Sequence, residues 1–187
     1  MKTRRNSSAK GSSFEREICK SLSLWWTQDE RDDVFWRTAG SGGRATNRAK
    51  RGQATSGAYG DLTYIDAIGK PLLDVCCFEI KRGYGQWCIL DIVDRRAGSK
   101  ACKAEDFWKQ ATTSAEQADV KYAAVIFKRD QKQIGIMFSK KMLSAAAPYL
   151  GPDRSTKAIV RIGTDDVVIM SFVAFLNYFT PEAVREL

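Results

Sequence analysis

The chain has 187 residues, with 30 lysines and arginines against 22 acidic residues and no histidine. The missing histidine excludes serine or cysteine nucleophiles activated by an imidazole, histidine general bases and histidine-ligated metals. Any hydrolysis by this chain therefore has to use carboxylates, lysine and a hard cation that prefers oxygen ligands. The net charge of +8 is compatible with a polyanionic partner such as nucleic acid, and equally with a merely basic protein.

The five cysteines include no CxxC pair, and their number is odd. Together with the lack of a signal-peptide pattern, this favours reduced thiols in a cytoplasm over disulfides or zinc. The sequence contains no apolar run of membrane-spanning length, so we expect no membrane contact. Its length and its 44% hydrophobic content fit one globular domain with a sizeable core.

The N-terminal elements are predicted as follows. Residues 1–11 are basic and polar, and indicate a flexible arm. The spacing of apolar residues predicts a helix over about 12–27, capped by Ser12 or Ser13. A short strand over 34–38 follows. Residues 42–60 then predict a long basic loop that carries four cations, Arg44, Arg48, Lys50 and Arg51. The alternative is a disordered insertion whose charge is incidental.

The middle of the chain predicts a β-hairpin. Residues 61–68 and 72–81 have strand composition, and Gly69-Lys70-Pro71 between them has the composition of a turn. Further along, we expect a helix over 103–118, strands over 121–129 and 133–139, and a helix from 140 that Ser139 caps. Strands over 157–163 and 166–170 and a helix capped by Thr180 complete the chain. This order predicts an α/β fold with a mixed sheet.

The predicted hairpin brings acidic residues together. Asp61 and Glu79 each lie nine residues from its centre, so they should be cross-strand neighbours roughly 4.5–5.5 Å apart at Cβ. Two carboxylates at that separation repel unless a cation lies between them, and oxygen ligands of this kind suit Mg²⁺. Lys81 lies on the same face as Glu79 and could orient a water molecule or offset charge on a phosphate.

The competing interpretation is an ordinary solvated face with a Glu–Lys pair. That interpretation predicts a polar face along the whole strand. The same face instead carries Leu73, Val75 and Cys77 before Glu79, and turns polar only at its end. We therefore favour a functional cluster.

Three motifs in order resemble a known family. Asp61 followed by Glu79-Ile80-Lys81 resembles the PD-(D/E)XK nuclease signature. "KGSSFEREI" (10–18) and "WRTAGS" (36–41) are similar to the first helix and the following turn of archaeal-type Holliday junction resolvases and related phage endonucleases. The resemblance covers about residues 10–138. It implies a restriction-endonuclease-like core of α-β-β-β-α-β order, with a mixed central sheet flanked by helices and a C-terminal α/β extension.

The resemblance also implies roles. Asp61 and Glu79 would ligate Mg²⁺, for which Mn²⁺ would substitute, together with the Ile80 backbone carbonyl and with Glu15 through water. Lys81 would be the catalytic lysine. The residues implied to contact DNA are the motif residues Arg37, Ser41 and Gln110, and we add the basic-loop cations Arg44, Arg48, Lys50 and Arg51, and Arg82.

Each role outside the D…ExK motif has a plainer alternative. Glu15 could serve only the helix N-terminus, Arg37 could be a surface cation, and Ser41 could be a turn residue. Gln110 could serve helix packing. The tryptophans are expected in the core, with Trp87 as the one considered for DNA contact. Gly60 stands where the family pattern has proline, the 42–60 loop is longer than in small resolvases, and residues 141–187 have no counterpart.

These patterns predict a nuclease core over 12–140 and an elaboration of the same domain over 141–187. The expected function is Mg²⁺-dependent DNA endonuclease, selective for branched DNA, acting as a homodimer in a prokaryotic or phage-infected cytoplasm. The alternatives are a nuclease for linear or single-stranded DNA, and a non-catalytic DNA-binding module with the same fold.

Overall fold

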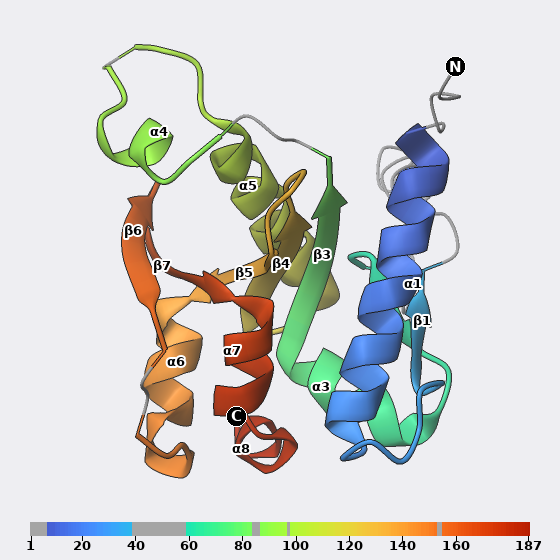
Figure 1. Ribbon diagram of the computed structural model, residues 1–187. Coiled ribbons are helices and arrows are strands. Elements are labelled where there is room, and N and C mark those ends of the chain that lie inside the picture. The colour runs from blue at the N-terminus through green and yellow to red at the C-terminus, as the bar shows by residue number, and fades with distance from the viewer. Residues whose placement is uncertain (1–6, 39–58, 84–86, 97, 153–154) are drawn as a thin grey trace.

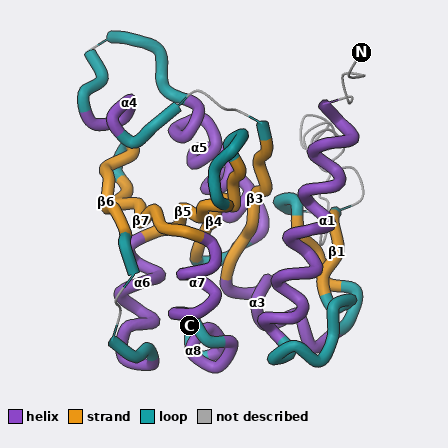
Figure 2. Tube along the Cα trace, in the orientation of Figure 1, coloured by secondary structure: helices purple, strands orange, loops and turns teal. Residues whose placement is uncertain are grey.

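The computed structural model describes residues 7–38, 59–83, 87–96, 98–152 and 155–187. Its centre is a five-stranded mixed sheet in the order β3-β4-β5-β7-β6 (Figures 1 and 2). β3 and β4 are parallel, and the other three pairings are antiparallel. The strands are β3 (Cys76–Arg82), β4 (Tyr122–Lys128), β5 (Ile134–Ser139), β6 (Lys157–Ile162) and β7 (Asp165–Ser171).

Helices cover both faces of this sheet. α1 (Ser7–Trp26), α6 (Lys140–Ala146), α7 (Phe172–Tyr178) and α8 (Pro181–Arg185) share one apolar core with alternate residues of the strands, and the short η2 (Ala147–Tyr149) follows α6. α5 (Lys103–Ala118) packs on the opposite face, beside the short α4 (Leu90–Val93). The predicted α/β class with a mixed, helix-flanked sheet is therefore confirmed. β7 and β6 extend the sheet beyond β5, so the C-terminal segment adds strands to it.

A separate two-stranded ribbon lies beside β3. β1 (Phe35–Arg37) pairs antiparallel with β2 (Leu62–Tyr64), with Arg37 opposite Leu62. The ribbon meets the main sheet where the backbone N–H of Asp61 donates to the carbonyl of Phe78 over 2.8 Å. The chain thereby positions Asp61 against the middle of β3.

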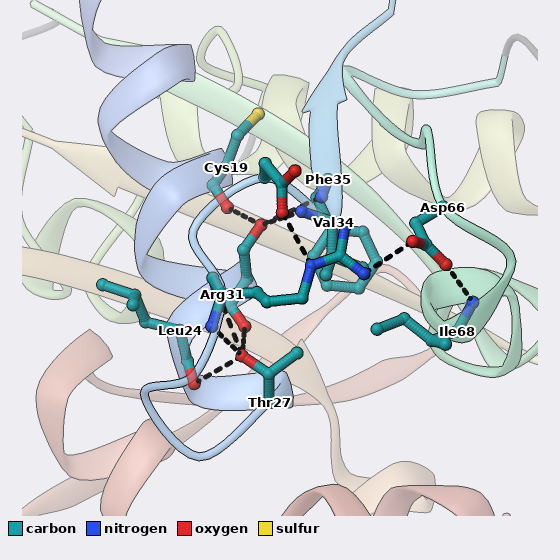
Figure 3. A network of polar contacts seen from close by, with 10 residues as sticks. Cys19, Leu24, Thr27, Arg31, Val34, Phe35, Asp66 and Ile68 are labelled. Carbon is teal, nitrogen blue, oxygen red and sulfur yellow. Dashed lines mark hydrogen bonds and ion pairs between the residues drawn. The ribbon is translucent and has the colours of Figure 1, made fainter.

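Buried side chains fix β1 against α1. The Ser23 hydroxyl donates to the Cys19 carbonyl and accepts from the backbone N–H groups of Val34 and Phe35 over 3.1 and 2.9 Å. Figure 3 shows this contact beside a second one, in which Arg31 donates to Asp66 over 2.6 Å. Asp66 in turn caps the helical turn after β2. Helix and ribbon are thus joined by the buried Ser23 hydrogen bonds, and the partly exposed Arg31–Asp66 pair supports them.

The predicted hairpin over 61–81 is wrong. After β2 the chain forms a 3₁₀ turn, η1 (Ala67–Gly69), and then the helix α3 (Lys70–Val75), and only Cys76–Arg82 is strand. Pro71 occupies a first-turn position of α3, and Lys70 pairs with Asp74 at i,i+4 spacing. Both features favour helix, and they override the β-rich composition that suggested a strand.

Two smaller predictions also need correction. The first helix begins at Ser7, five residues before Ser12, because the polar residues that precede Ser12 include no proline to stop it. Ser12 and Ser13 therefore lie inside the helix and do not cap it.

The helix over 103–118 and the caps at Ser139 and Thr180 are confirmed, since Ser139 accepts from Met142 and Thr180 from Ala183.

Candidate active site

Asp61 is a buried carboxylate, 6% exposed, at the start of β2. Its backbone bridges two strands, because its N–H donates to Phe78 while its carbonyl accepts from Thr38 over 3.1 Å. Its side chain is also tied to β3, where the Ile80 N–H donates to Oδ2 over 2.8 Å. These contacts fix the carboxylate relative to the β3 backbone.

Gly60 explains the departure from the proline of the family pattern. Its φ is +70°, which proline cannot adopt and other side chains adopt only with strain. A Cβ here would also lie 2.5 Å from the Phe78 carbonyl and 2.8 Å from Cys77 Sγ. Only glycine lets the chain pass this close to β3 and deliver Asp61.

Glu79 and Lys81 lie on the face of β3 that α5 covers. Glu79 is 2% exposed, and its Oε2 accepts from Lys81 Nζ over 2.5 Å. Lys81 Nζ also contacts Asp61 Oδ2 over 3.3 Å, so one ammonium joins the two buried carboxylates. Asp61 and Glu79 are therefore neighbours, although through the Asp61–β3 contact and not through a hairpin.

α5 supplies two further partners for Glu79. Gln110 Nε2 donates to Oε2 over 2.8 Å, and the Ser114 hydroxyl donates to Oε1 over 3.0 Å. The two residues are one turn apart and share a helix face. Sequence reasoning missed Ser114, although its i,i+4 spacing from Gln110 is a signal that could have found it.

Burial and charge shape the electrostatics of this cluster. Burial, reinforced by the Asp61 carboxylate, raises the pKa of Glu79 to about 6. Burial by itself disfavours the charged form of Lys81, but the carboxylates of Asp61 and Glu79 outweigh it, so the Lys81 pKa is raised. Without a bound cation, the negative charge of the buried Asp61 and Glu79 carboxylates is therefore unfavourable.

A divalent cation fits this donor set. Asp61 and Glu79 offer carboxylate oxygens, and the Ile80 N–H that reaches Asp61 places the Ile80 carbonyl on the same side of β3. Within the described segments, no cluster of three or more His, Cys, Asp and Glu side chains suited to a metal is found. An ion held by two carboxylates and a carbonyl would complete its coordination with water and substrate, as Mg²⁺ commonly does.

Glu15 and Arg37 pair with each other on the α1 side. Arg37 Nε donates to Glu15 Oε2 over 2.7 Å, and both side chains are mostly buried. The thiol of Cys19, one turn after Glu15, is influenced by the charges of this pair and of Asp61. Burial raises the Cys19 pKa to about 12, and the charges of Glu15 and Asp61 add to that shift. The charges of this pair and of Asp61 thus act on the same thiol, while Glu15 and Arg37 are bonded to each other.

The remaining predicted DNA contacts divide into two groups. Arg82 lies 5.7 Å from the ring centre of Phe14, at the end of β3. Ser41 and the basic-loop residues Arg44, Arg48, Lys50 and Arg51 lie outside the described residues. Trp87, considered for DNA contact, is only 6% exposed, packs on Phe127 and is covered by Arg129, so it belongs to the core.

Apart from the short η1, α3 and α4, the order is α1, β1, β2, β3, α5, β4, with a carboxylate before β3 and a Glu-x-Lys on it, which is typical of the PD-(D/E)XK class of nucleases. Comparison with protein families agrees: the family described as "Phage putative PDDEXK endonuclease" matches residues 6–186. The chain belongs to this family of phage nucleases. Searches of curated proteins and of solved structures gave no match. No helix in the described part of the chain could span a membrane.

Proposed function

We propose that this chain is a Mg²⁺-dependent DNA endonuclease that hydrolyses phosphodiester bonds with a water nucleophile and selects branched DNA. The observation that carries the proposal is the contact of Lys81 Nζ with both Asp61 and Glu79. Two buried carboxylates beside one lysine are costly to the fold, and they are the groups that this hydrolysis needs.

The residues divide the work as follows. Asp61, Glu79 and the Ile80 carbonyl would hold the cation, and Glu15 would contribute through water. When bound, the cation supplies a water of lowered pKa and offsets charge on the phosphate. Lys81 donates N–H groups that orient the attacking water and stabilise the negative charge of the transition state. Gln110 and Ser114 keep the Glu79 carboxylate in place.

The DNA partner is proposed from charge and position. The net charge of +8 favours a polyanion. Arg37 ends β1 next to Thr38, whose backbone N–H donates to the Asp61 carbonyl. Arg37 and Ser41 would contact the phosphate to be cut. The basic-loop residues, Arg82 and Gln110 would contact the flanking DNA. Symmetric cutting of a four-way junction needs two sites, so the proposal includes a homodimer acting in the cytoplasm of a prokaryotic or phage-infected cell.

The test compares a labelled four-way junction with its matching linear duplex and single strand, in Mg²⁺ and in EDTA. Wild type is assayed beside Lys81→Ala and a control, Lys70→Ala, whose exposed ammonium pairs with Asp74 within α3. We expect symmetric junction cuts by wild type and Lys70→Ala. These cuts should be lost in EDTA and reduced at least about 100-fold in Lys81→Ala.

Other outcomes would change the proposed substrate or the proposed activity. Equal cutting of the linear duplex or of the single strand would keep the nuclease and remove the selectivity for branched DNA. Salt-dependent binding with no Mg²⁺-dependent cutting of any substrate would identify a non-catalytic DNA-binding module.

A further inference from the structure

The two faces of the β1–β2 ribbon differ in their surroundings. Phe35 and Arg37 point to the α1 side, because Phe35 is fully buried in the core that α1 shares and Arg37 pairs with Glu15. Side chains alternate along a strand, so Trp36 between them points to the opposite face. Its cross-strand partner there is Thr63.

That opposite face is also the face of Glu79 and Lys81. On β3, Phe78 and Ile80 pack in the α1 core, while Cys77 packs in the α5 core. Glu79 alternates with Phe78 and Ile80, and it is bonded by α5 through Gln110 and Ser114. α1 packs against both β1 and β3, so Trp36 and the carboxylate–lysine cluster each point away from the side of their strand that α1 covers.

Trp36 is left exposed at this position. It is 46% exposed, whereas Trp26, Trp87 and Trp108 are each below 7%. Trp25 is half-buried, and its indole N–H donates to the Phe179 carbonyl over 3.0 Å. Core packing accounts for the other four rings but leaves that of Trp36 unexplained.

We propose, resting on the nuclease function above, that the Trp36 ring stacks on an unpaired base beside the phosphate to be cut. β1 pairs with β2, and β2 begins beside Asp61, whose side chain contacts Lys81, so the ribbon that carries Trp36 adjoins the cluster. Exposed aromatic side chains on which bases stack are a common platform for single-stranded nucleic acid. Bases inside a continuous duplex are already stacked on one another. The substrate class is therefore DNA with unpaired nucleotides at the cut, as at a junction centre, a flap or a single strand.

The test measures affinity in Ca²⁺, which supports binding without rapid cutting, for a fluorescent single-stranded oligonucleotide and for its continuous duplex. The variants are Trp36→Ala, Trp36→Phe and, as a control, Tyr149→Ala, which removes an exposed ring (52%) at the end of the α6–η2 segment. We expect Trp36→Ala to weaken single-strand binding about tenfold or more, and Trp36→Phe to weaken it less. Duplex binding and the Tyr149→Ala control should stay within about twofold.

Salt dependence separates stacking from charge. Loss of a stacked base should leave the slope of log affinity against log salt unchanged, whereas loss of a phosphate contact reduces it by about one. Replacing single bases with abasic sites should identify one position at which wild type and Trp36→Ala bind equally. The slope and this equality are readouts that a general folding defect would not give.

Three results would overturn the proposal. They are an equal loss for single strand and duplex, no loss for either, or a change of oligomeric state in Trp36→Ala that shows the ring in a protein interface. The outcome is independent of catalysis: selective loss of single-strand affinity by Trp36→Ala would stand even if wild type cut nothing. In that case the proposed nuclease function would be wrong, and the proposed stacking of Trp36 on a base would still hold.

Discussion

The backbone N–H of Ile80 donates a hydrogen bond to Oδ2 of Asp61 over 2.8 Å, although 19 residues separate the two. This contact holds a carboxylate against the strand that carries Glu79 and Lys81. It depends on the close passage of residues 60–61 along β3, which makes the local backbone as important as the acidic side chains.

Replacing Gly60 should therefore harm both fold and site. Gly60→Ala puts a side chain at φ +70° and against the Phe78 carbonyl, so we expect stability to fall by more than about 1–2 kcal/mol, together with a loss of cleavage. Gly163→Ala is the matched control, because its φ is +60° but nothing lies within 4 Å of the added Cβ. Urea unfolding and junction cleavage measure the two effects. Equal behaviour of the two variants would show that the close passage is unimportant.

Thr38 carries a buried hydroxyl for which no hydrogen-bond partner is found, among the residues that the structure describes. An unsatisfied buried polar group costs about 1–3 kcal/mol. Thr38→Val keeps the shape and removes the hydroxyl, so it should raise the free energy of unfolding by about 1 kcal/mol in the metal-free protein. Thr38→Ser keeps the hydroxyl and should give no gain. Chemical denaturation decides, and a less stable Thr38→Val would show that the hydroxyl is bonded in solution.

The pKa of Glu79 predicts a pH dependence of stability without metal. Burial, together with Asp61, raises this pKa from 4.5 to about 6, so the folded state binds more protons than the unfolded state between these values. Stability should fall as the pH rises through that window, by up to about 2 kcal/mol. Glu79→Gln lacks this titration, so it should be more stable than wild type at pH 7.5 in EDTA, and the gap should close below pH 4.5.

The control for that pH profile is Glu182→Gln. A backbone hydrogen bond lowers the Glu182 pKa at the start of α8, so the sign of its contribution is reversed. Denaturation curves at several pH values measure both variants. A Glu79→Gln profile parallel to that of wild type would contradict a raised Glu79 pKa.

Thiol reactivity should single out one cysteine. Burial raises the pKa of Cys19 and of Cys77 to about 12, and raises that of Cys76 well above its usual value. Burial also raises the pKa of Cys102, whereas Cys88 is exposed. Because the thiolate is the reactive form, a disulfide reagent should modify Cys88 first in the native protein. Cys88→Ser should remove the fast phase and Cys19→Ser should not. A fast phase that survives Cys88→Ser would show that a buried thiol is accessible.

The sequence predicted the sheet class and the carboxylate–lysine cluster better than it predicted the path of the chain between Asp61 and Glu79. Asp61 and Glu79 do meet, but the turn assumed at Lys70 is the start of a helix, signalled by Pro71 and the Lys70–Asp74 pair. Composition alone could not show that Asp61 contacts β3 through its own backbone, because that contact depends on the φ of Gly60.

The C-terminal helix α7 was missed for a related reason. Residues 167–176 form an almost continuous apolar run, in which the period of a strand and that of a helix are hard to separate. The boundary is set locally, where the Ser171 side chain accepts from the Ala174 N–H and ends β7. Likewise, the exposure of Trp36 depends on which elements cover its face, which no local pattern encodes.

We propose that Asp61 and Glu79 hold the cation required for cutting. The most direct measurement is the single-turnover cleavage rate of a four-way junction against Mg²⁺ concentration, for wild type and Asp61→Asn. Asp61→Asn keeps the shape of the side chain and removes its charge. We expect no cutting in EDTA, a saturable rise with Mg²⁺ for wild type, and a loss of about 1,000-fold or more in Asp61→Asn. Cutting in EDTA, or an Asp61→Asn protein with the wild-type Mg²⁺ profile, would contradict it.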